Sequence, residues 1–357
     1  MLRNYLVATG NPYGYPCQAA HLTHLARTAN GERRTAMIDR PLRLLLSYHY
    51  YKDENLDELL GCFPPELKLD IFADSGAWSA FSVGAPVVAA EYVAWVERWK
   101  HHFSVAAGPD VIGDAAATCS ATERMIARGL GLPVLPTFHV GEDWDYLDRY
   151  AAMADYIAFG GMVPLSTNRT LLAAWCRQAF ARLPDGVRVH GFGMTTWPVL
   201  CAFPWHSVDS SSWTSCFRYA RLALFDAVRG RFSVINMRSP PETLAAAPLL
   251  ATYDLRPTDV QAKTYDRDRV CAASVRAWQR AEDWLNTHVF LASTAIADAT
   301  PSGPRALGRA VSAYLALNGN PPTDAATDGR SIRLACRRPA GPSDDVHMLS
   351  RVTKGKP

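Results

Sequence analysis

The sequence predicts an α/β fold, a (β/α)8 barrel of the TIM type with an N-terminal extension and a mainly helical C-terminal appendage. Short runs of β-forming residues alternate with segments of helical periodicity along most of the 357 residues. Eight such alternations favour a closed parallel barrel over an open doubly wound sheet. After about residue 252, a long amphipathic segment is followed by stretches rich in Pro, Gly and Asp. We therefore expect an extension over 1–41, the barrel over 42–251, a helical appendage over 252–329 and a basic, flexible tail over 330–357.

The expected barrel strands are short apolar runs bounded by polar or turn-forming residues. A helical segment follows each of them, which allows successive strands to run parallel. They are 42–48, 69–73, 111–113, 134–138, 156–159, 187–191, 207–209 and 232–236.

The expected helices show apolar residues at helical spacing and recognisable end signals. Residues 89–100 place four apolar side chains on one face, Tyr92, Trp95, Val96 and Trp99. Such a face could stack on a ligand, but at this spacing we interpret it as core. Ser120 and Glu123 form a capping box, which predicts the start of a helix that runs through Ala127. The other expected helices are 168–183, 214–228, 267–289 and 305–317.

Composition and cysteine usage are those of a globular protein in a reducing compartment. Hydrophobic residues make up 48% of the chain and charged residues 20%, which excludes wholesale disorder. No run of eighteen apolar residues occurs, so we expect no membrane-spanning helix. The eight cysteines form no C-x-x-C or C-x-C motif, so neither a zinc knuckle nor a redox pair is predicted. We expect a cytoplasmic protein.

The formal net charge of +3 is too small to indicate a nucleic-acid partner by itself. From Arg330 to the end, seven Lys and Arg residues outweigh two Asp residues. A charge run of this kind is typical of a solvated, disordered end, which is the interpretation we favour. The alternative is an arm that contacts phosphates.

Chemically capable residues follow the expected strands at their carboxyl ends. In a parallel barrel these ends form one rim, where the loops after the strands build the active site. An apolar strand that ends in Asp is unfavourable as packing, because a carboxylate there must be solvated, paired or functional. The residues expected at this rim are Ser47, His49, Asp74, Ser75, Gly76, Asp114, His139, Gly160, Gly161, His190, Gly191, Phe192, Gly193, Asp209, Ser210 and Asn236.

Each of these residues also has a structural interpretation. Asp74, Asp114 and Asp209 could each cap a turn or the helix that follows. A partly buried, hydrogen-bonded imidazole is the default for His139 and His190. The glycines could permit tight turns, or could let a flat ligand approach the backbone. Three aspartates on one rim together favour the functional interpretation.

Five short segments occur in a recognisable order: D-S-G-A at 74–77, P-D-V-I-G-D at 109–114, A-F-G-G-M at 158–162, H-G-F-G at 190–193 and V-D-S at 208–210. They resemble the motifs of the tRNA-guanine transglycosylase superfamily. That family has an Asp-Ser-Gly-Gly motif, a strand that ends in a guanine-recognising Asp, a Gly-Gly-Leu backbone site, a Gly-Val-Gly turn and a Phe-Asp-Cys or Phe-Asp-Ser nucleophile. The resemblance covers about residues 42–240, and the order and spacing of the motifs make it fairly specific.

Within that superfamily, the chain looks most like the branch that acts on deoxypurines in DNA and is found in bacterial DNA-modification clusters and phages. The stretches 47–50 and 208–213 carry this likeness. The bacterial tRNA enzymes hold zinc with a C-x-C-x-x-C cluster and a later His, and this cluster is missing here. No recognisable RNA-binding module follows the barrel either. Both absences weaken the case for a tRNA substrate.

The resemblance implies a pentosyltransferase that exchanges guanine in DNA for a 7-deazaguanine base. By match, Asp209 is the nucleophile at the sugar C1′, and Asp74 moves protons as one base leaves and the other arrives. Asp114 would accept the N1–H and N2–H₂ groups of guanine, while Phe192 or Trp78 would stack on its ring. The other implied substrate-binding residues are Ser75, Gly76, His139, Gly160, Gly161, His190 and Gly191.

This chemistry requires no metal and no organic cofactor. The expected partners are DNA, whose target base must leave the duplex or lie in unpaired DNA, a free 7-deazaguanine base, and proteins of a DNA-modification system. The expected location is the cytoplasm of a bacterium or of a phage-infected host. Three alternatives stay open: a tRNA substrate, a glycosidase that only releases the base, and a non-catalytic barrel subunit that binds nucleic acid for a partner.

Overall fold

The computed structural model describes residues 2–8, 20–31, 40–82, 84–261, 263 and 265–288. The expected helix at 305–317 and the basic tail at 330–357 lie outside these residues. Within the described ranges, no helix combines the length and the apolar character that crossing a membrane requires.

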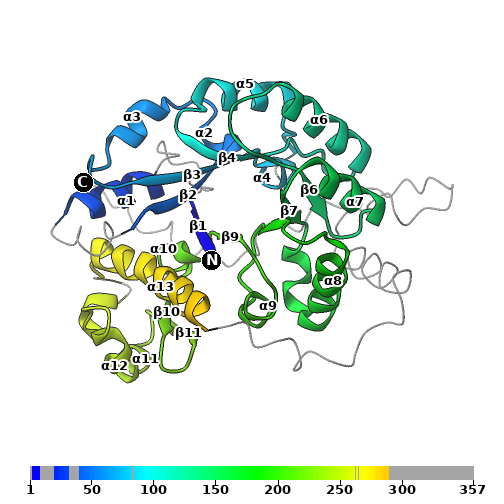
Figure 1. Ribbon diagram of the computed structural model, residues 1–357. Helices are drawn as coiled ribbons and strands as arrows, with labels where there is room; N and C mark the ends of the chain where they lie inside the picture. The colour runs from blue at the N-terminus through cyan, green and yellow to red at the C-terminus, as the bar shows by residue number, and fades with distance from the viewer. Residues whose placement is uncertain are drawn as a thin grey trace, which may run out of the picture.

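Nine parallel strands form a nearly closed barrel with helices around its outside (Figure 1). They are β1 (Arg3–Val7), β2 (Leu42–Ser47), β3 (Leu69–Asp74), β4 (Phe103–Ala107), β5 (Val134–Leu135), β6 (Thr137–His139), β7 (Tyr156–Gly160), β8 (Arg188–Gly191) and β9 (Ser207–Ser210). Their order is β5-β4-β3-β2-β1-β9-β8-β7-β6, so the first strand of the chain pairs with the last strand of the barrel. β5 and β6 are halves of one segment interrupted at Pro136, whose carbonyl oxygen accepts a hydrogen bond from the Ala158 amide at 2.8 Å. The predicted (β/α)8 architecture is therefore confirmed.

Helices connect the strands on the outer face of the barrel. They are α1 (Ala20–Asn30), α2 (Tyr48–Tyr51), α3 (Leu56–Gly61), α4 (Ala77–Ser82), α5 (Ala89–Trp99), α6 (Ala115–Ala127), α7 (Trp144–Met153), α8 (Arg169–Arg182) and α9 (Trp197–Ala202). The aromatic face of α5 is buried, as the spacing predicts. Asn168 caps α8 by accepting a hydrogen bond from the Leu171 amide at 3.1 Å.

A cluster of apolar side chains fills the barrel interior. Its largest members are Tyr5, Phe72 and Tyr156, which point inward from three different strands. Val7 and Phe192 pack on this cluster while staying partly exposed. The cluster therefore forms a solid floor beneath the carboxyl-end rim of the barrel.

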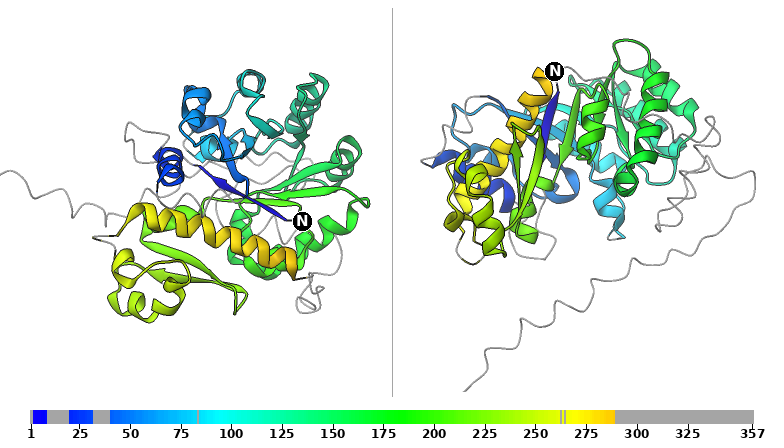
Figure 2. Two further views of the ribbon diagram at one scale, coloured as in Figure 1. Left: turned by 60° about the vertical axis from the view of Figure 1, so that its left-hand side comes forward. Right: turned by 90° about the horizontal axis from the view of Figure 1, so that it is seen from below.

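A smaller unit packs against one side of the barrel. It holds the antiparallel hairpin β10 (Arg221–Asp226) and β11 (Arg231–Asn236), with the short helices α10 (Ser215–Tyr219), α11 (Pro240–Ala245) and α12 (Ala247–Ala251) and the long helix α13 (Arg267–Thr287). Figure 2 shows α13 lying between the hairpin and the barrel. Leu222, Leu224, Leu250 and Val270 share a core of their own in this unit.

Several predicted elements are wrong. Residues 111–113, predicted as the third barrel strand, lie in an irregular loop and turn, and β4 precedes them. Residues 214–228, predicted as one helix, form η3 (Ser212–Thr214), α10 and then β10. Residues 232–236 pair with β10 rather than joining the barrel. The missing barrel strand is β1, so the barrel begins at Arg3, inside the predicted N-terminal extension.

The cause is that a short apolar run does not specify its partner strand or even its secondary structure. The Leu-Ala-Leu-Phe run of β10 suits a helix as well as a strand, and pairing with β11 decides between them. Ser120 lies inside α6 rather than at its start, because Asp114 caps this helix six residues earlier.

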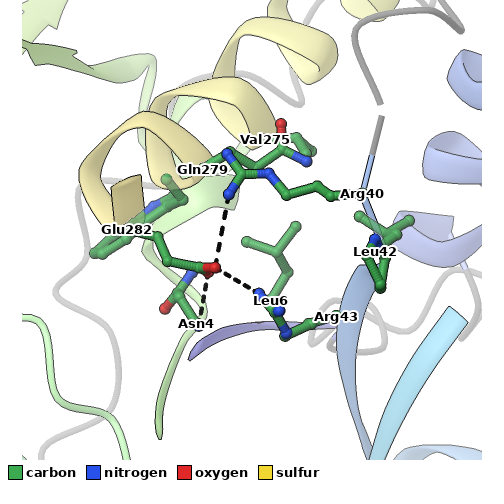
Figure 3. A pocket seen from close by; sticks show the side chains of 10 residues that line it. Asn4, Leu6, Arg40, Leu42, Arg43, Val275, Gln279 and Glu282 are labelled. Atoms are coloured by element: carbon green, nitrogen blue, oxygen red, sulfur yellow. Dashed lines mark hydrogen bonds and ion pairs between the residues drawn. The ribbon is translucent and has the colours of Figure 1, made fainter. Parts of the chain in front are cut away.

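Glu282 of α13 joins the appendage to the amino end of the barrel (Figure 3). The register of β1 with β2 covers only Leu6 and Val7, so the Asn4 amide donates to Glu282 Oε2 instead, at 3.0 Å. Arg43 of β2 donates to Glu282 Oε1 at 2.6 Å, and the Glu282 side chain is only 7% exposed. One buried carboxylate thus bridges the gap between β1 and β2.

We expect Glu282→Ala to lower the free energy of unfolding by about 3 kcal/mol, because it removes the buried acceptor of the Asn4 amide and leaves Arg43 with only its longer contact to Asp70, at 3.4 Å. Chemical denaturation measures the difference. The matched control is Asp283→Ala on the same helix, whose exposed carboxylate pairs with Arg40 and should cost at most about 1 kcal/mol. Equal losses for the two variants would show that Glu282 has no special role at this gap.

Candidate active site

A cavity of about 300 Å³ lies at the carboxyl ends of the barrel strands. This is the end of a parallel barrel where active sites are found, and the volume suits a small molecule. Its apolar lining includes Val7, Leu45, Ala107 and Phe192. Eight of the predicted site residues line it: Asp74, Ser75, Gly76, His139, Gly160, Gly161, Phe192 and Asp209.

Asp209 is held in place by two donors on one of its oxygens. It lies on β9, and its Oδ1 accepts hydrogen bonds from the Gly193 amide at 2.9 Å and from His190 Nε2 at 3.2 Å. Since these bonds fall on Oδ1, Oδ2 is the oxygen left to face a ligand. Asp209 is 6% exposed and lines the cavity, so this oxygen is both oriented and accessible.

His190 lies beneath the cavity and not on its wall. Burial lowers its pKa, so the imidazole is neutral and carries a single ring proton. Because a carboxylate can only accept, that proton is on Nε2, and Nδ1 accepts from Ser207 Oγ at 2.6 Å. Ser207 Oγ in turn accepts from the Tyr156 hydroxyl at 2.6 Å. A directed chain of buried hydrogen bonds therefore fixes the orientation of Asp209.

Asp74 is the last residue of β3, and its carboxyl group titrates far from the usual range. Burial, followed by repulsion from the Asp209 carboxylate, raises the pKa of Asp74 from 3.8 to about 7. The Gly76 amide donates to Asp74 Oδ2 at 2.9 Å and opposes this rise in part. Near neutral pH, Asp74 can therefore both hold and release a proton, as a general acid and base must.

A second group of charges lies on the opposite wall. The His139 ring lies between two carboxylates, with Nε2 3.0 Å from Asp110 Oδ2 and Nδ1 2.9 Å from Glu142 Oε1. Burial opposes the charged ring, but Asp110 and Glu142 outweigh it and raise the pKa of His139 well above 6.5. His139 is thus an imidazolium that orients Asp110 toward the cavity.

Asp114 lies outside the cavity lining, so the geometry gives no support to the base-recognition role predicted for it. It is exposed, does not line the cavity, and caps α6 by accepting a hydrogen bond from the Ala117 amide at 2.8 Å. Asp110 occupies the wall instead, four residues earlier in the same motif. The chain turns between them at Gly113, which has a positive φ of 82°.

Close backbone packing explains two of the predicted glycines. A Cβ on Gly76, whose φ is +70°, would collide with the Ser47 hydroxyl. A Cβ on Gly160 would lie 2.6 Å from the His139 ring and displace it. Gly191, unlike these two, does not line the cavity. A Cβ on Gly191 would lie 2.8 Å from the Trp205 ring.

Two further residues complete the cavity. The Ser47 hydroxyl is buried beside the cavity and has no hydrogen-bond partner among the described residues. The sequence places Ser47 at the rim because it lies near the end of an expected strand, but it predicts no role for this residue. Glu142 is not among the residues predicted from the sequence. Its position three residues after His139 could have indicated the ion pair between them. Trp78 lines the mouth and is 47% exposed.

The charge of the cavity restricts its ligands. Four carboxyl groups, those of Asp74, Asp110, Glu142 and Asp209, line it with one imidazolium. No Lys or Arg occurs among its described lining residues. The lining therefore favours a ligand rich in N–H donors and disfavours phosphate inside the cavity.

Comparison of the chain with protein-family models and with curated proteins finds no match to either.

We expect Asp74→Asn to stabilise the folded protein progressively as the pH rises from about 4 to about 7. Over this window the unfolded chain has released the Asp74 proton while the folded protein retains it, so rising pH favours unfolding of the wild type. Asn does not titrate and can still accept from the Gly76 amide. Urea denaturation across this range measures the difference, which should level off above about pH 7. Asp114→Asn is the control, and the hypothesis fails if both differences stay constant with pH.

Proposed function

We propose that the chain is a transglycosylase that exchanges guanine in DNA for a 7-deazaguanine base through a covalent aspartyl-glycosyl intermediate. One observation carries the proposal: a carboxyl group with a pKa near 7, Asp74, lies beside an oriented carboxylate, Asp209, in a cavity large enough for a purine. Cleavage of an N-glycosidic bond needs this pair, an acid for the leaving base and a nucleophile for the sugar.

In the first half-reaction, Asp209 Oδ2 attacks C1′ while the bond from C1′ to guanine N9 breaks. The bonding electrons leave with the base, and protonated Asp74 supplies the proton that neutralises it. The Gly193 amide and His190 hold Oδ1, so that Oδ2 alone reacts. The sugar then forms an ester with Asp209, and the strand is never released as an abasic site.

In the second half-reaction, ionised Asp74 removes a proton from N9 of the incoming 7-deazaguanine. This nitrogen attacks C1′ and displaces the Asp209 carboxylate. Two displacements at one carbon retain its configuration. Both Asp74 and Asp209 return to their starting protonation states, so the cycle needs no other proton carrier.

Recognition of the base is assigned to Asp110. Guanine and 7-deazaguanine both present N1–H and N2–H₂ donors, which match the oxygens of a carboxylate. His139 occupies Asp110 Oδ2 with one hydrogen bond, and each carboxylate oxygen has room for a second. The unpaired Ser47 hydroxyl is a further hydrogen-bonding group for the ring.

DNA would lie across the mouth, with one base turned into the cavity. Trp78 and Phe81 of α4 are exposed and stack on each other with ring centroids 6.4 Å apart, a surface on which neighbouring bases can stack. We favour DNA over tRNA because the C-x-C-x-x-C cluster is missing from the sequence.

The purified chain should incorporate labelled 7-deazaguanine into guanine-containing DNA, and Asp209→Asn should reduce incorporation by about a thousandfold or more, since it removes the nucleophile. A denaturing gel should also show a protein–DNA adduct for the wild type only. Asp114→Asn is the matched control and should keep nearly full activity. Incorporation by Asp209→Asn at the wild-type rate would refute the mechanism.

The same assay with tRNA in place of DNA separates the two substrates. Label entering tRNA but not DNA would keep the chemistry and refute the DNA assignment. Release of free guanine without incorporation would indicate a glycosidase instead.

Asp110→Asn should lower kcat/KM by about a hundredfold or more, because the amide NH₂ would face the N–H donors of guanine and leave buried polar groups unpaired. Steady-state kinetics with varied DNA and varied free base measure this loss. Asp114→Asn again provides the control, and an unaffected Asp110→Asn variant would place base recognition elsewhere.

A further inference from the structure

Two histidines and an aspartate converge on the surface, apart from the cavity. Asp57 lies in the first turn of α3, and His101 and His102 form the short link from α5 to β4. Asp57 Oδ1 lies 3.1 Å from His101 Nε2 and 2.6 Å from His102 Nε2. All three potential ligand atoms lie within 4.8 Å of one another.

We propose that Asp57, His101 and His102 bind a divalent transition-metal ion of the zinc type. Ligand bonds of about 2.0–2.1 Å in a tetrahedral site separate neighbouring ligand atoms by roughly 3.3 Å. The two measured separations from Asp57 Oδ1 are within about 0.7 Å of that value. Small rotations of the side chains are therefore enough to admit an ion.

The ligand set selects the class of ion. Two imidazole nitrogens with one carboxylate suit Zn²⁺, Co²⁺, Ni²⁺ or Cu²⁺, whereas Mg²⁺ and Ca²⁺ prefer oxygen ligands throughout. The side chains of Asp57 and His101 are more than half exposed, and that of His102 is 22% exposed. Water can therefore complete the coordination, and the ion can exchange with solvent.

Packing holds the two rings close to this arrangement. His101 and His102 lie with ring centroids 4.1 Å apart, and each centroid is 6.2 Å from that of Trp99. Trp99 is buried at the end of α5, so it gives both rings a fixed support. The ordering cost of binding is lower than for two free surface histidines.

The position of the cluster indicates a stabilising role. His102 directly precedes β4, so the cluster lies at the amino ends of the strands, opposite the cavity. Residues at that end of a parallel barrel serve stability. An ion here would link α3 to the start of β4, two segments 44 residues apart in the chain. It would bind the folded protein in preference to the unfolded chain and raise its melting temperature.

The test is calorimetric titration of Zn²⁺ into the full chain, purified without a histidine tag and freed of metal with a chelator. We expect one ion per chain at this site, an absorption band of tetrahedral Co²⁺ when Co²⁺ replaces Zn²⁺, and a Tm that rises with Zn²⁺. Asp57→Asn and the double variant His101→Ala/His102→Ala should each weaken this binding at least about tenfold and remove the Tm rise.

Glu58→Gln is the matched control, because it removes an exposed carboxylate next to Asp57 that belongs to a separate hydrogen bond with Asn55. His288→Ala controls for the loss of an exposed histidine. Both should bind Zn²⁺ like the wild type. Absence of binding to the wild type at micromolar Zn²⁺, or equal binding by all variants, would overturn the proposal. The outcome does not depend on the transglycosylase activity.

Discussion

Strand β1 aligns the two sides of the cavity, because it is hydrogen-bonded to β2 on one edge and to β9 on the other. Its register places Tyr5 opposite Asp209, and the register of β2 places Ser47 opposite Asp74. Parallel strands present their carboxyl ends at one rim, and both aspartates line the cavity there. A slip of one residue in β1 would turn the inward side chains outward and remove the floor that Tyr5 provides.

The proposed chemistry depends on different environments for two like groups. Asp209 accepts hydrogen bonds from an amide and from a neutral imidazole on one oxygen. Asp74 receives the Gly76 amide, but burial and the nearby charge of Asp209 raise its pKa. A carboxyl group that is buried beside a second carboxylate keeps its proton to a higher pH than a free one. The same arrangement costs stability above neutral pH, as is common at functional sites.

The appendage supports the barrel at the end away from the cavity. Glu282 of α13 satisfies the amide of Asn4 where β2 does not reach it, and Arg43 neutralises the buried carboxylate. The appendage is therefore part of the barrel's hydrogen-bond network and not a separate attachment.

Much of the architecture could be predicted from local pattern. Alternation of apolar runs and helical segments predicts the barrel, and an apolar strand that ends in Asp predicts the positions of Asp74 and Asp209. Both signals can be read from a few consecutive residues. β1 and the hairpin could not be assigned in this way, since a run of five or six residues does not reveal which edge it pairs with.

The sequence by itself determined the fold class and two of the four carboxyl groups that line the cavity, Asp74 and Asp209, because strand periodicity and strand ends are local properties. Only the tertiary structure decided between Asp110 and Asp114, since the turn at Gly113 sends one to the cavity wall and the other to the cap of α6. The tertiary structure alone also shows that His190 contacts Asp209 and that Asp57 contacts the paired histidines. Such contacts depend on how distant segments pack, which no local pattern specifies.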